Sequence, residues 1–473
     1  MKRVVIIGGG LSGLSAAYQL AREAQVEFTL FEASARLGGI VETVRENGFV
    51  IECGPDSWVT EKPWARELAV ELGLASEIIP SNDHQRRTYL LQKDQLIPMP
   101  DGMRMMVPAQ LDAIADSPLF SERARQAYRR EPERAEELKA SALKEHEDES
   151  VASFVRRHFG DEVTRTIAGP LLAGVFGGDI EALSVRAVMP AFVKMEREHG
   201  SLIAALQSRA GQSESAVFTT LRSGLGTLIE RMTATLPAGC VQLSNEVIAL
   251  TPAGRGWRIH TTDAEEICDA VIVATPAHVA RRLLRPIHVQ FERLLAMEAT
   301  SAIVVALAFS SEQAHRLRIP RGFGYLVPQQ GGPAPQLDPA QQLNKDSQLL
   351  ACTFVDQKFA YRAPEGGILL RGFFGGEVAA ALLEESDEAL TALTLRRLSA
   401  VLGPLPSPTF SVVRRWPLSL PQYAVGHLER MARLEALVAS FPGLHLAGNA
   451  YYGVGLPDMV RMGRDAACRA AQA

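Results

Sequence analysis

The chain has 473 residues, of which 47% are hydrophobic and 22% charged, so it has material for two or three domains at about 150 residues each. This composition excludes wholesale disorder. The formal net charge of −5 argues against a protein that grips nucleic acid through many phosphate contacts, so we expect no nucleic-acid partner.

Cysteine usage and the apolar stretches restrict the protein further. The five cysteines are an odd number, lie far apart and form no C-x-x-C pair, so we expect neither a disulfide framework nor a metal site. A reducing, cytoplasmic setting fits this pattern. The longest apolar stretch, residues 299–309, is far shorter than the roughly 20 residues of a membrane-spanning helix. Attachment to the inner face of the cell membrane stays open, as does a homodimer.

The chain begins with a pattern typical of dinucleotide binding. Residues 3–7 are a β-branched run that predicts a buried parallel strand, and residues 14–23 have helical spacing. Between them, Gly8, Gly10 and Gly13 fit the G-x-G-x-x-G spacing. Gly8 would permit the tight turn, Gly10 would let the backbone approach a pyrophosphate, and Gly13 would let the helix pack on the strand. The helix N-terminus would offer N–H groups to the phosphates.

A second strand, residues 26–31, ends in Glu32, 19 residues after Gly13. A carboxylate there can accept hydrogen bonds from ribose hydroxyls and would repel a 2′-phosphate. Strand, helix, second strand and terminal acid all agree with a dinucleotide site. A βαβ unit without a ligand is the alternative.

Two further turns favour FAD over NAD. Arg36 precedes the pair Gly38-Gly39, which can carry the chain across a pyrophosphate and place a cation beside it. The cluster Gly54-Pro55-Asp56-Ser57 would be a second turn at the cofactor or simply a turn on the surface.

The C-terminal end repeats the arrangement of strand, glycines and helix. Residues 443–447 predict a short strand, and a helix follows from about residue 458. Its positive end could stabilise the charge that builds up at N1 and O2 of a reduced flavin. The simpler alternative is a helix capped by Asp458. Strand-like residues 241–250 and 270–276 lie between the two ends, so we expect a discontinuous nucleotide-binding domain.

Several motifs together resemble those of the FAD-containing amine oxidase/protoporphyrinogen oxidase superfamily. They are GGGLSGLSAAYQL, FEASARLGG, LSNEVIAL, DAVIVATPAH and AGNAYYGVGLPDMVRMG. Residues 169–184, 322–328 and 352–376 look like the oxygen-dependent porphyrinogen oxidases in particular. Two departures stand out: amine oxidases usually carry Arg where this chain has Ile40, and their covalent-flavin cysteine has no counterpart. The resemblance therefore implies FAD held non-covalently.

The resemblance implies an α/β fold with a Rossmann-like FAD domain in three segments, residues 1–85, 215–278 and 415–473. A mixed-sheet substrate domain would comprise 86–100 and 279–414, with strands at 301–309, 324–327, 349–355 and 367–374. A helical, membrane-facing domain would span 101–214, with a charged helical stretch at 121–150 and one helix at 184–198. Residues 329–347, rich in Pro, Gln and Gly, would form a flexible insertion.

The activity implied is the six-electron oxidation of protoporphyrinogen IX to protoporphyrin IX in heme biosynthesis, with oxygen reduced to hydrogen peroxide. The flavin does the hard chemistry, so we expect no catalytic residue beyond it. Coproporphyrinogen III, with four propionates instead of two, is the alternative substrate, favoured by extra basic residues around the pocket. More distant alternatives are an amine oxidase, a carotenoid desaturase and a non-redox prenyl-protein chaperone.

The resemblance also implies particular site residues. Arg104 would hold a propionate between flexible methionines, where residue type alone suggests a surface arginine. The tetrapyrrole pocket would be lined by residues that are otherwise ordinary core: Gly174, Phe323, Leu326 and Phe373. FAD would be held by Gly8, Gly9, Gly10, Leu11, Ser12, Gly13, Glu32, Ala33, Arg36, Gly39, Ile40, Gly54, Pro55, Asp56, Ser57, Val247, Trp416, Val454, Gly455 and Leu456.

Overall fold

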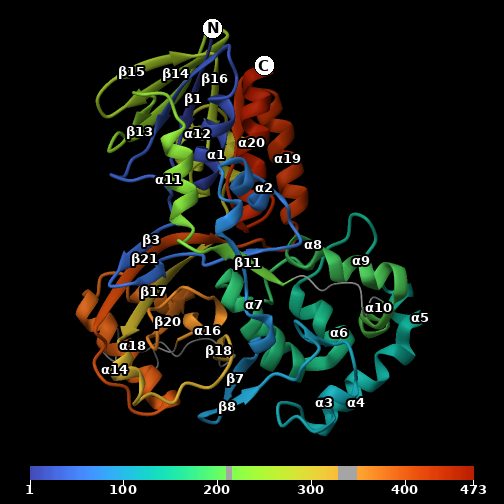
Figure 1. The fold of residues 1–473 in the computed structure, drawn as a ribbon. Helices are drawn as coiled ribbons and strands as arrows, with labels where there is room; N and C mark the ends of the chain where they lie inside the picture. The colour runs from blue at the N-terminus through green and yellow to red at the C-terminus, as the bar shows by residue number, and fades with distance from the viewer. Residues whose placement is uncertain (209–215, 329–348, 473) are drawn as a thin grey trace. The chain divides into compact units, whose positions relative to one another are not determined.

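The computed structural model describes residues 1–208, 216–328 and 349–472. The chain divides into two compact units (Figure 1). Unit 1 comprises Met1–Ser81, Ala216–Ala299 and Leu428–Ala473, and unit 2 comprises Asn82–Ser215 and Thr300–His427.

Unit 1 is built on a five-stranded sheet in the order β12-β2-β1-β16-β22, with all neighbours parallel. Its strands are β1 (Lys2–Ile7), β2 (Val26–Phe31), β12 (Val241–Gln242), β16 (Ala270–Val273) and β22 (Leu444–Leu446). The predictions for the strands near both ends of the chain are confirmed. The buried parts of the two central strands, residues 4–7 of β1 and 270–273 of β16, are entirely apolar because helices cover both faces of a parallel sheet.

The first and last helices pack against each other beside this sheet. They are α1 (Leu11–Leu20) and α20 (Leu456–Gln472), and a Cβ added to Gly463 would lie 2.1 Å from the carbonyl oxygen of Ser12. Such a close approach of two helix backbones requires a glycine. The two ends of the chain therefore fold together within unit 1.

Smaller elements complete unit 1. The remaining strands are β3 (Thr43–Glu46), β4 (Phe49–Glu52), β5 (Trp58–Val59), β6 (Ile78–Pro80), β11 (Phe218–Leu221), β13 (Val247–Ala253), β14 (Gly256–Thr261) and β15 (Glu265–Cys268). The remaining helices are α2 (Trp64–Glu71), α11 (Gly226–Ala234), α12 (Ala277–Leu284), α13 (Val289–Leu294) and α19 (His427–Ala439).

Unit 2 contains a seven-stranded sheet in the order β21-β17-β20-β19-β18-β7-β8. These strands are β7 (Thr88–Gln92), β8 (Gln95–Pro98), β17 (Ala299–Phe309), β18 (Gly324–Leu326), β19 (Ala351–Phe354), β20 (Ile368–Gly375) and β21 (Phe410–Pro421). The sheet is mixed, because β18 and β7 run parallel while β17, β20, β19 and β18 pair antiparallel. One face packs on α18 (Asp387–Leu402), as the shared core of Val305, Tyr325, Phe374 and Leu390 shows.

Helices make up the rest of unit 2. They are α3 (Asp112–Ala115), α4 (Glu122–Arg130), α5 (Ala135–Ala140), α6 (Val151–Val163), η4 (Thr164–Ala168), α7 (Gly169–Phe176), α8 (Val185–Val188), α9 (Pro190–His199), α10 (Leu202–Ser208), α14 (Ser311–Ala314), α16 (Val355–Lys358) and α17 (Gly376–Ala381). The hairpin of β9 (Met103–Arg104) and β10 (Val107–Pro108) precedes them.

The prediction of one helix over residues 184–198 is wrong. The chain forms α8 and α9 instead, and Met189 between them has φ −132° and ψ 46°. Pro190 has no N–H for a helical hydrogen bond, and its ring pushes the preceding residue out of the helical region. The apolar face continues across the break, so periodicity alone suggested a continuous helix.

The units differ from the predicted domain boundaries at three described segments. Residues 82–85, predicted as the end of the first FAD segment, lie in unit 2. Residues 279–299 lie in unit 1, where Leu283 and Phe291 join its core, and residues 415–427 lie in unit 2, where β21 belongs to the large sheet. The insertion predicted at 329–347 lies outside the described residues.

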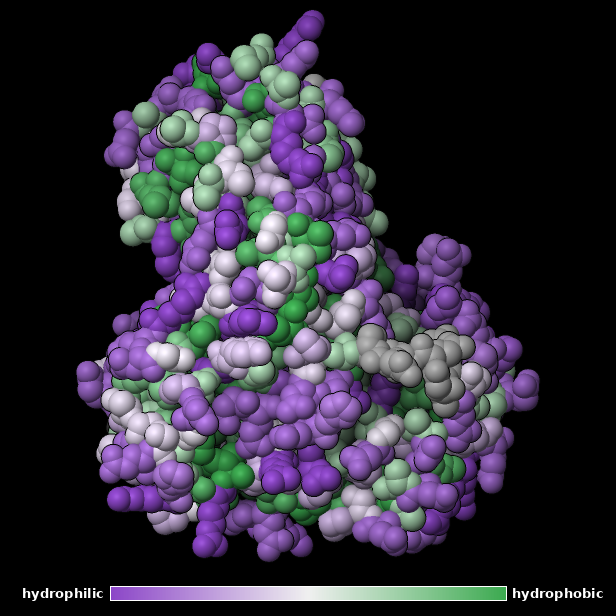
Figure 2. All heavy atoms as spheres, in the orientation of Figure 1, coloured by the Kyte–Doolittle hydropathy of each residue, from purple (hydrophilic) through white to green (hydrophobic). Residues whose placement is uncertain are grey.

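The surface and the helices bear on the expected contact with a membrane. Hydrophilic side chains predominate on the face shown in Figure 2, with apolar residues in separate patches. Within the described part of the chain, no helix combines the length and the apolar character needed to cross a bilayer.

Candidate functional site

Three glycines shape the turn between β1 and α1, and each has different surroundings. Gly8 has φ +105°, and a Cβ added to it would lie 2.7 Å from the Ala274 carbonyl oxygen. An added Cβ at Gly13 would lie 1.9 Å from the carbonyl oxygen of Gly8. At Gly10 the nearest neighbour of such a Cβ is Gly39 Cα, 3.9 Å away. The fold therefore requires Gly8 and Gly13, whereas the space beside Gly10 is open.

The N-terminus of α1 suits a phosphate group. Gly10 occupies its N-cap position with no side-chain cap, and no acidic residue lies in the first turn. Helices α4, α6 and α18 instead begin with serines that cap them. Ser12 is 4% exposed, and its hydroxyl has no hydrogen-bond partner among the described residues. Free helix N–H groups and an unpartnered hydroxyl are what an anion needs at a helix N-terminus.

Glu32 follows β2 and reaches back to the turn. One carboxylate oxygen accepts a hydrogen bond from the Gly9 N–H (2.6 Å), and the other accepts one from the Ser34 N–H (2.8 Å). The exposed Ala33 lies between Glu32 and Ser34 in the chain. The Asn245 N–H donates to the Glu32 carbonyl (3.0 Å). Val247, buried at the start of β13, is thereby held near the same acid. A carboxylate has lone pairs beyond these two bonds, so it can still accept ribose hydroxyls.

The predicted second and third turns join the first one. The Gly38 N–H donates to the Gly9 carbonyl (2.8 Å), and Arg36 donates to the carbonyl of Gly39 (2.5 Å). A Cβ on Gly54 would lie 2.0 Å from the Ile40 carbonyl oxygen, so the turn at 54–57 packs directly on residue 40.

The rest of the 54–57 turn is half-buried, with Ser57 donating to the Asp56 carboxylate (2.7 Å) and Pro55 beside them. The structure thus brings residues 8–13, 32–40 and 54–57 into contact with one another within unit 1. Their contact with FAD remains a prediction.

The C-terminal glycines precede α20 as predicted. Val454 and Gly455 are half-buried, Leu456 is buried at the first helical position, and the Met459 N–H donates to the Gly455 carbonyl (3.1 Å). Helices α1 and α20 follow parallel strands, β1 and β22, so their N-termini share the carboxyl edge of the sheet. Ligands of open α/β sheets bind at this edge.

Two charged residues near these turns, Lys62 and Glu52, were not predicted from the sequence. Lys62 Nζ lies 2.6 Å from Asp458 Oδ2 in the first turn of α20, and Asp458 is 4% exposed. Glu52, 1% exposed, accepts hydrogen bonds from the Thr43 hydroxyl (2.7 Å) and from the Leu225 N–H that opens α11 (2.8 Å). Neither residue belongs to a spacing pattern that a sequence could reveal.

A hollow in unit 1 lies away from these turns. It has a volume of about 560 Å³ and is lined by the starts of β1 and β2, including Arg3 and Glu27, together with Gly239 and Cys240. This is the amino edge of the sheet, opposite the glycine turns, so we do not assign it to the nucleotide.

In unit 2, strand register brings several predicted substrate residues onto one sheet face. Leu326 pairs with Ala351, Ala351 with Phe373, and Phe373 with Val304. Directly paired residues point to the same face, so Leu326 and Phe373 lie two strand spacings, about 10 Å, apart. A Cβ on Gly174 of α7 would lie 3.4 Å from Leu326 Cδ2. We call the residues Leu326, Ala351, Phe373 and Val304 the apolar row.

Three other predicted residues are not joined to the apolar row by these pairings. Phe323 is 8% exposed and precedes β18, where its N–H donates to the Arg87 carbonyl (2.8 Å). Arg104 is exposed on the β9–β10 hairpin, beside the fully buried Met106. Trp416 is half-buried on β21 of unit 2, so its predicted flavin contact remains a prediction.

Unit 2 has two further local features. The π-helical turn η4 leads directly into α7, and such turns are frequent at functional sites. Asp356 of α16 accepts a hydrogen bond from the Leu369 N–H of β20 (3.0 Å). Burial raises the pKa of Asp356 above its ordinary value, and the backbone donor partly opposes that shift.

Comparison with known proteins identifies the family. The profile of the flavin containing amine oxidoreductases matches residues 11–471. Coproporphyrinogen III oxidase of Bacillus subtilis is 33% identical over 98% of this chain and 97% of its own. Protoporphyrinogen oxidase of Bos taurus is 30% identical over 99% of this chain and 98% of its own.

Solved structures agree with this assignment. A candidate protoporphyrinogen oxidase from Exiguobacterium sp. 255-15 has a TM-score of 0.82, 31% identity and 98% coverage of both chains. Cyclohexylamine oxidase from Brevibacterium oxydans, at 17% identity and a TM-score of 0.70 over 100% of this chain and 99% of its own, shares the fold. The protein therefore belongs to the flavin containing amine oxidoreductase family, as a flavoprotein oxidoreductase of its porphyrinogen oxidase group.

Proposed function

We propose that the protein oxidises coproporphyrinogen III to coproporphyrin III. The observation that carries this proposal is the similarity over 98% of the chain to coproporphyrinogen III oxidases of Bacillus subtilis (33% identity), Staphylococcus aureus (28%) and Propionibacterium freudenreichii (32%). The reaction removes six electrons and six protons, and three molecules of oxygen become three of hydrogen peroxide.

In this proposal, unit 1 binds FAD non-covalently. The N–H groups of α1 and the Ser12 hydroxyl would hold the pyrophosphate, Glu32 would accept the ribose hydroxyls, and α20 would direct its N-terminus at the flavin. When bound, the flavin supplies the hydride acceptor. The residues of unit 1 thus need only to bind and orient it.

Unit 2 would bind the tetrapyrrole on the apolar row. Leu326 and Phe373 would contact the flat macrocycle, and Gly174 would let it approach the α7 backbone, since it carries no side chain. Arg104 would pair with a propionate at the rim, where its exposed guanidinium can form two parallel hydrogen bonds.

Protoporphyrinogen IX, the first substrate expected from the sequence, remains the second candidate. Protoporphyrinogen oxidases of Bos taurus and Homo sapiens are each 30% identical to this chain. The two substrates differ in charge, with four propionates against two, so recognition of carboxylates would decide between them.

The two porphyrinogens should be supplied side by side to purified, FAD-loaded protein. We expect porphyrin fluorescence and hydrogen peroxide from both, with kcat/KM at least about tenfold higher for coproporphyrinogen III. Heat-inactivated protein corrects for spontaneous oxidation. A preference for protoporphyrinogen IX would reverse the assignment of substrate, and equal rates would contradict the expected preference. A flavin that neither substrate reduces anaerobically would refute the proposed function.

Contact with a membrane surface and formation of a homodimer stay predictions for this protein. Flotation with liposomes tests the first, and light scattering of the purified protein tests the second.

A further inference from the structure

Helix α20 carries a buried acid in its first turn. Asp458 is the third residue of the helix, and its side chain is 6% exposed. A Cβ added to Gly453 would lie 2.4 Å from Asp458 Cγ, and one added to Gly455 would lie 3.2 Å from Asp458 Oδ2. The carboxylate therefore lies against residues 453–455, the loop that we expect to meet the flavin.

An acid in this position opposes the positive end of its own helix. The aligned peptide dipoles of a helix are equivalent to roughly +0.5 of an elementary charge at the N-terminus. The carboxylate of Asp458 stabilises the helix there, but its full negative charge exceeds that partial positive charge. A reduced flavin gathers negative charge at N1 and O2, so an uncompensated acid would disfavour the reduced form.

Lys62 supplies a compensating cation. Its Nζ lies 2.6 Å from Asp458 Oδ2, and its side chain is 43% exposed. Because the acid is buried, this pair is screened by salt less than a pair on the surface. The two side-chain charges cancel, and the sum at this end of α20 becomes positive again.

The packing of α2 on α20 holds Lys62 near the acid. Lys62 lies in the turn after β5, and Trp64, two residues later, opens α2. Arg461, three residues after Asp458 in α20, places its Cζ 5.0 Å from the centroid of the Trp64 ring. The start of α2 thus runs beside the first turns of α20, and Lys62 comes from a segment whose place is fixed.

We propose that Lys62 raises the reduction potential of the bound flavin by cancelling the charge of Asp458 at the N-terminus of α20. This inference rests on the proposed function, in which that helix end faces the flavin. Lys62 favours the reduced flavin and Asp458 disfavours it, so the two act with opposite signs. Lys62 is a positioning residue in this scheme, since it acts through the acid and the helix end. A higher potential makes the flavin a stronger oxidant of the porphyrinogen.

Four variants test the inference: Lys62→Met, Lys62→Arg, Asp458→Asn and the double variant Lys62→Met with Asp458→Asn. Arg258→Met is the matched control, because Arg258 pairs with Glu265 (2.9 Å) in the separate sheet of β13, β14 and β15 in unit 1. The midpoint potential of each FAD-loaded protein is measured by anaerobic equilibration with redox dyes, without any porphyrinogen. Flavin content and thermal midpoint are recorded for every variant.

We expect Lys62→Met to shift the equilibrium about tenfold toward oxidised flavin, the order of effect of one unit charge in a partly buried site. This shift lowers the potential by about 30 mV, as a tenfold change does for a two-electron couple. Asp458→Asn should shift the equilibrium about tenfold the other way. The double variant, Lys62→Arg and the control should stay within about threefold of wild type. Loosened packing alone would not give opposite shifts that cancel.

The same titrations can overturn the inference. It is wrong if Lys62→Met shifts the equilibrium no more than Arg258→Met does, or if the double variant keeps the lowered potential of Lys62→Met. Should Lys62→Met fail to retain FAD, Asp458→Asn decides: a raised potential supports the inference, and an unchanged or lowered one contradicts it. A wild type that binds FAD but oxidises neither porphyrinogen would refute the proposed function instead, and the dye titration would still test Lys62.

Discussion

Gly10 and Gly13 lie three residues apart in one turn, yet their surroundings imply opposite consequences of substitution. A side chain at Gly10 enters open space, with Gly39 Cα 3.9 Å from its Cβ, and the residue has an ordinary φ of −68°. A side chain at Gly13 collides with the backbone of Gly8 at 1.9 Å. The first substitution would fill a ligand site, and the second would disrupt the packing of helix on strand.

We therefore expect Gly10→Val to fold with a wild-type thermal midpoint for the flavin-free protein but to retain less than about a tenth of the flavin, since its side chain occupies the pyrophosphate position. Gly13→Val should destabilise even the flavin-free protein by more than the about 1–3 kcal/mol of ordinary overpacking, because backbone atoms must move. Flavin absorbance and thermal unfolding with and without FAD measure both effects. Full flavin content in Gly10→Val would contradict the phosphate-turn assignment.

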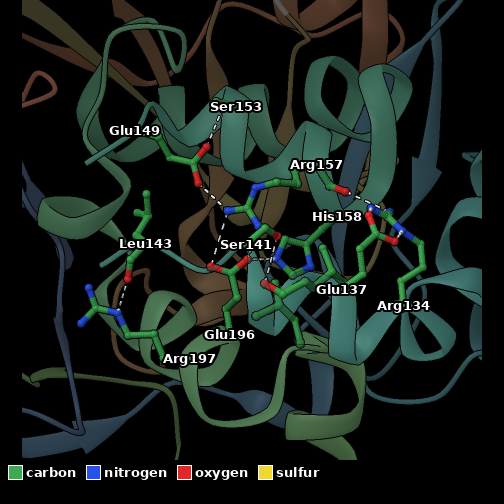
Figure 3. Close-up of polar contacts among 12 residues, drawn as sticks. Arg134, Glu137, Ser141, Leu143, Glu149, Ser153, Arg157, His158, Glu196 and Arg197 are labelled. Carbon is green, nitrogen blue, oxygen red and sulfur yellow. Dashed lines mark hydrogen bonds and ion pairs between the residues drawn. The ribbon is translucent and has the colours of Figure 1, made fainter. Parts of the chain in front are cut away.

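At the scale of elements, a buried charge network ties the helices of unit 2 together (Figure 3). His158 of α6 lies 3.0 Å from Glu131 and 3.0 Å from Glu196 of α9, and all three side chains are 0% exposed. Arg157 pairs with both Glu196 and Glu149, and the Leu202 N–H that opens α10 donates to Glu131 (2.7 Å). The network thus joins α6, α9 and α10, and the three groups at its centre, His158, Glu131 and Glu196, are shielded from water.

The pKa shifts in this network have opposite signs. Burial disfavours the imidazolium, but hydrogen bonds with Glu131 and Glu196 outweigh it and raise the pKa of His158 above 6.5. Burial likewise opposes ionisation of Glu196, but His158 and Arg157 outweigh it and hold its pKa below 4.5. The stabilisation from His158 is complete below pH 6.5 and is lost as pH rises through its folded pKa. That from Glu196 is complete above pH 4.5 and is lost as pH falls through its folded pKa.

We expect the contribution of the pair to be greatest between pH 4.5 and 6.5, the ordinary pKa values of the two groups. His158→Gln should lower the free energy of unfolding by about 3–5 kcal/mol at pH 6, as removal of one partner from a buried ion pair does. It should lower it less at pH 9. Chemical unfolding at both pH values measures this, with the exposed His146→Gln as control. An effect of equal size at both pH values would show that folding does not raise the pKa of His158.

For the whole molecule, the features that could be predicted are local in the sequence. The β-branched run of β1, the glycine spacing and the acid after β2 each reflect a constraint within a few residues, and the structure places them as expected. Glu52 could not be found that way, because its surroundings depend on hydrogen bonds with residues far along the chain, such as Leu225. The break at Met189 was overlooked although Pro190 signals it, since the apolar pattern runs through both helices.

The division into two units leads to a prediction about where each ligand acts. FAD should slow amide hydrogen exchange in segments of unit 1 that are far apart in sequence: residues 8–13, 32–40 and 454–458. Coproporphyrin III should slow it in β18, β19 and β20 of unit 2, because bound backbone opens less often. Exchange followed by mass spectrometry on flavin-free protein, FAD-loaded protein and FAD-loaded protein with coproporphyrin III separates the two effects.

The Gly10→Val protein is the control for that experiment, because FAD should leave its unit 1 segments unchanged. The opening turn and the start of α20 must respond together, since α1 and α20 pack on each other and their N-termini share one edge of the sheet. Protection of the opening turn without residues 454–458 would remove α20 from the flavin site. Protection by FAD confined to unit 2 would contradict the assignment of the nucleotide to unit 1.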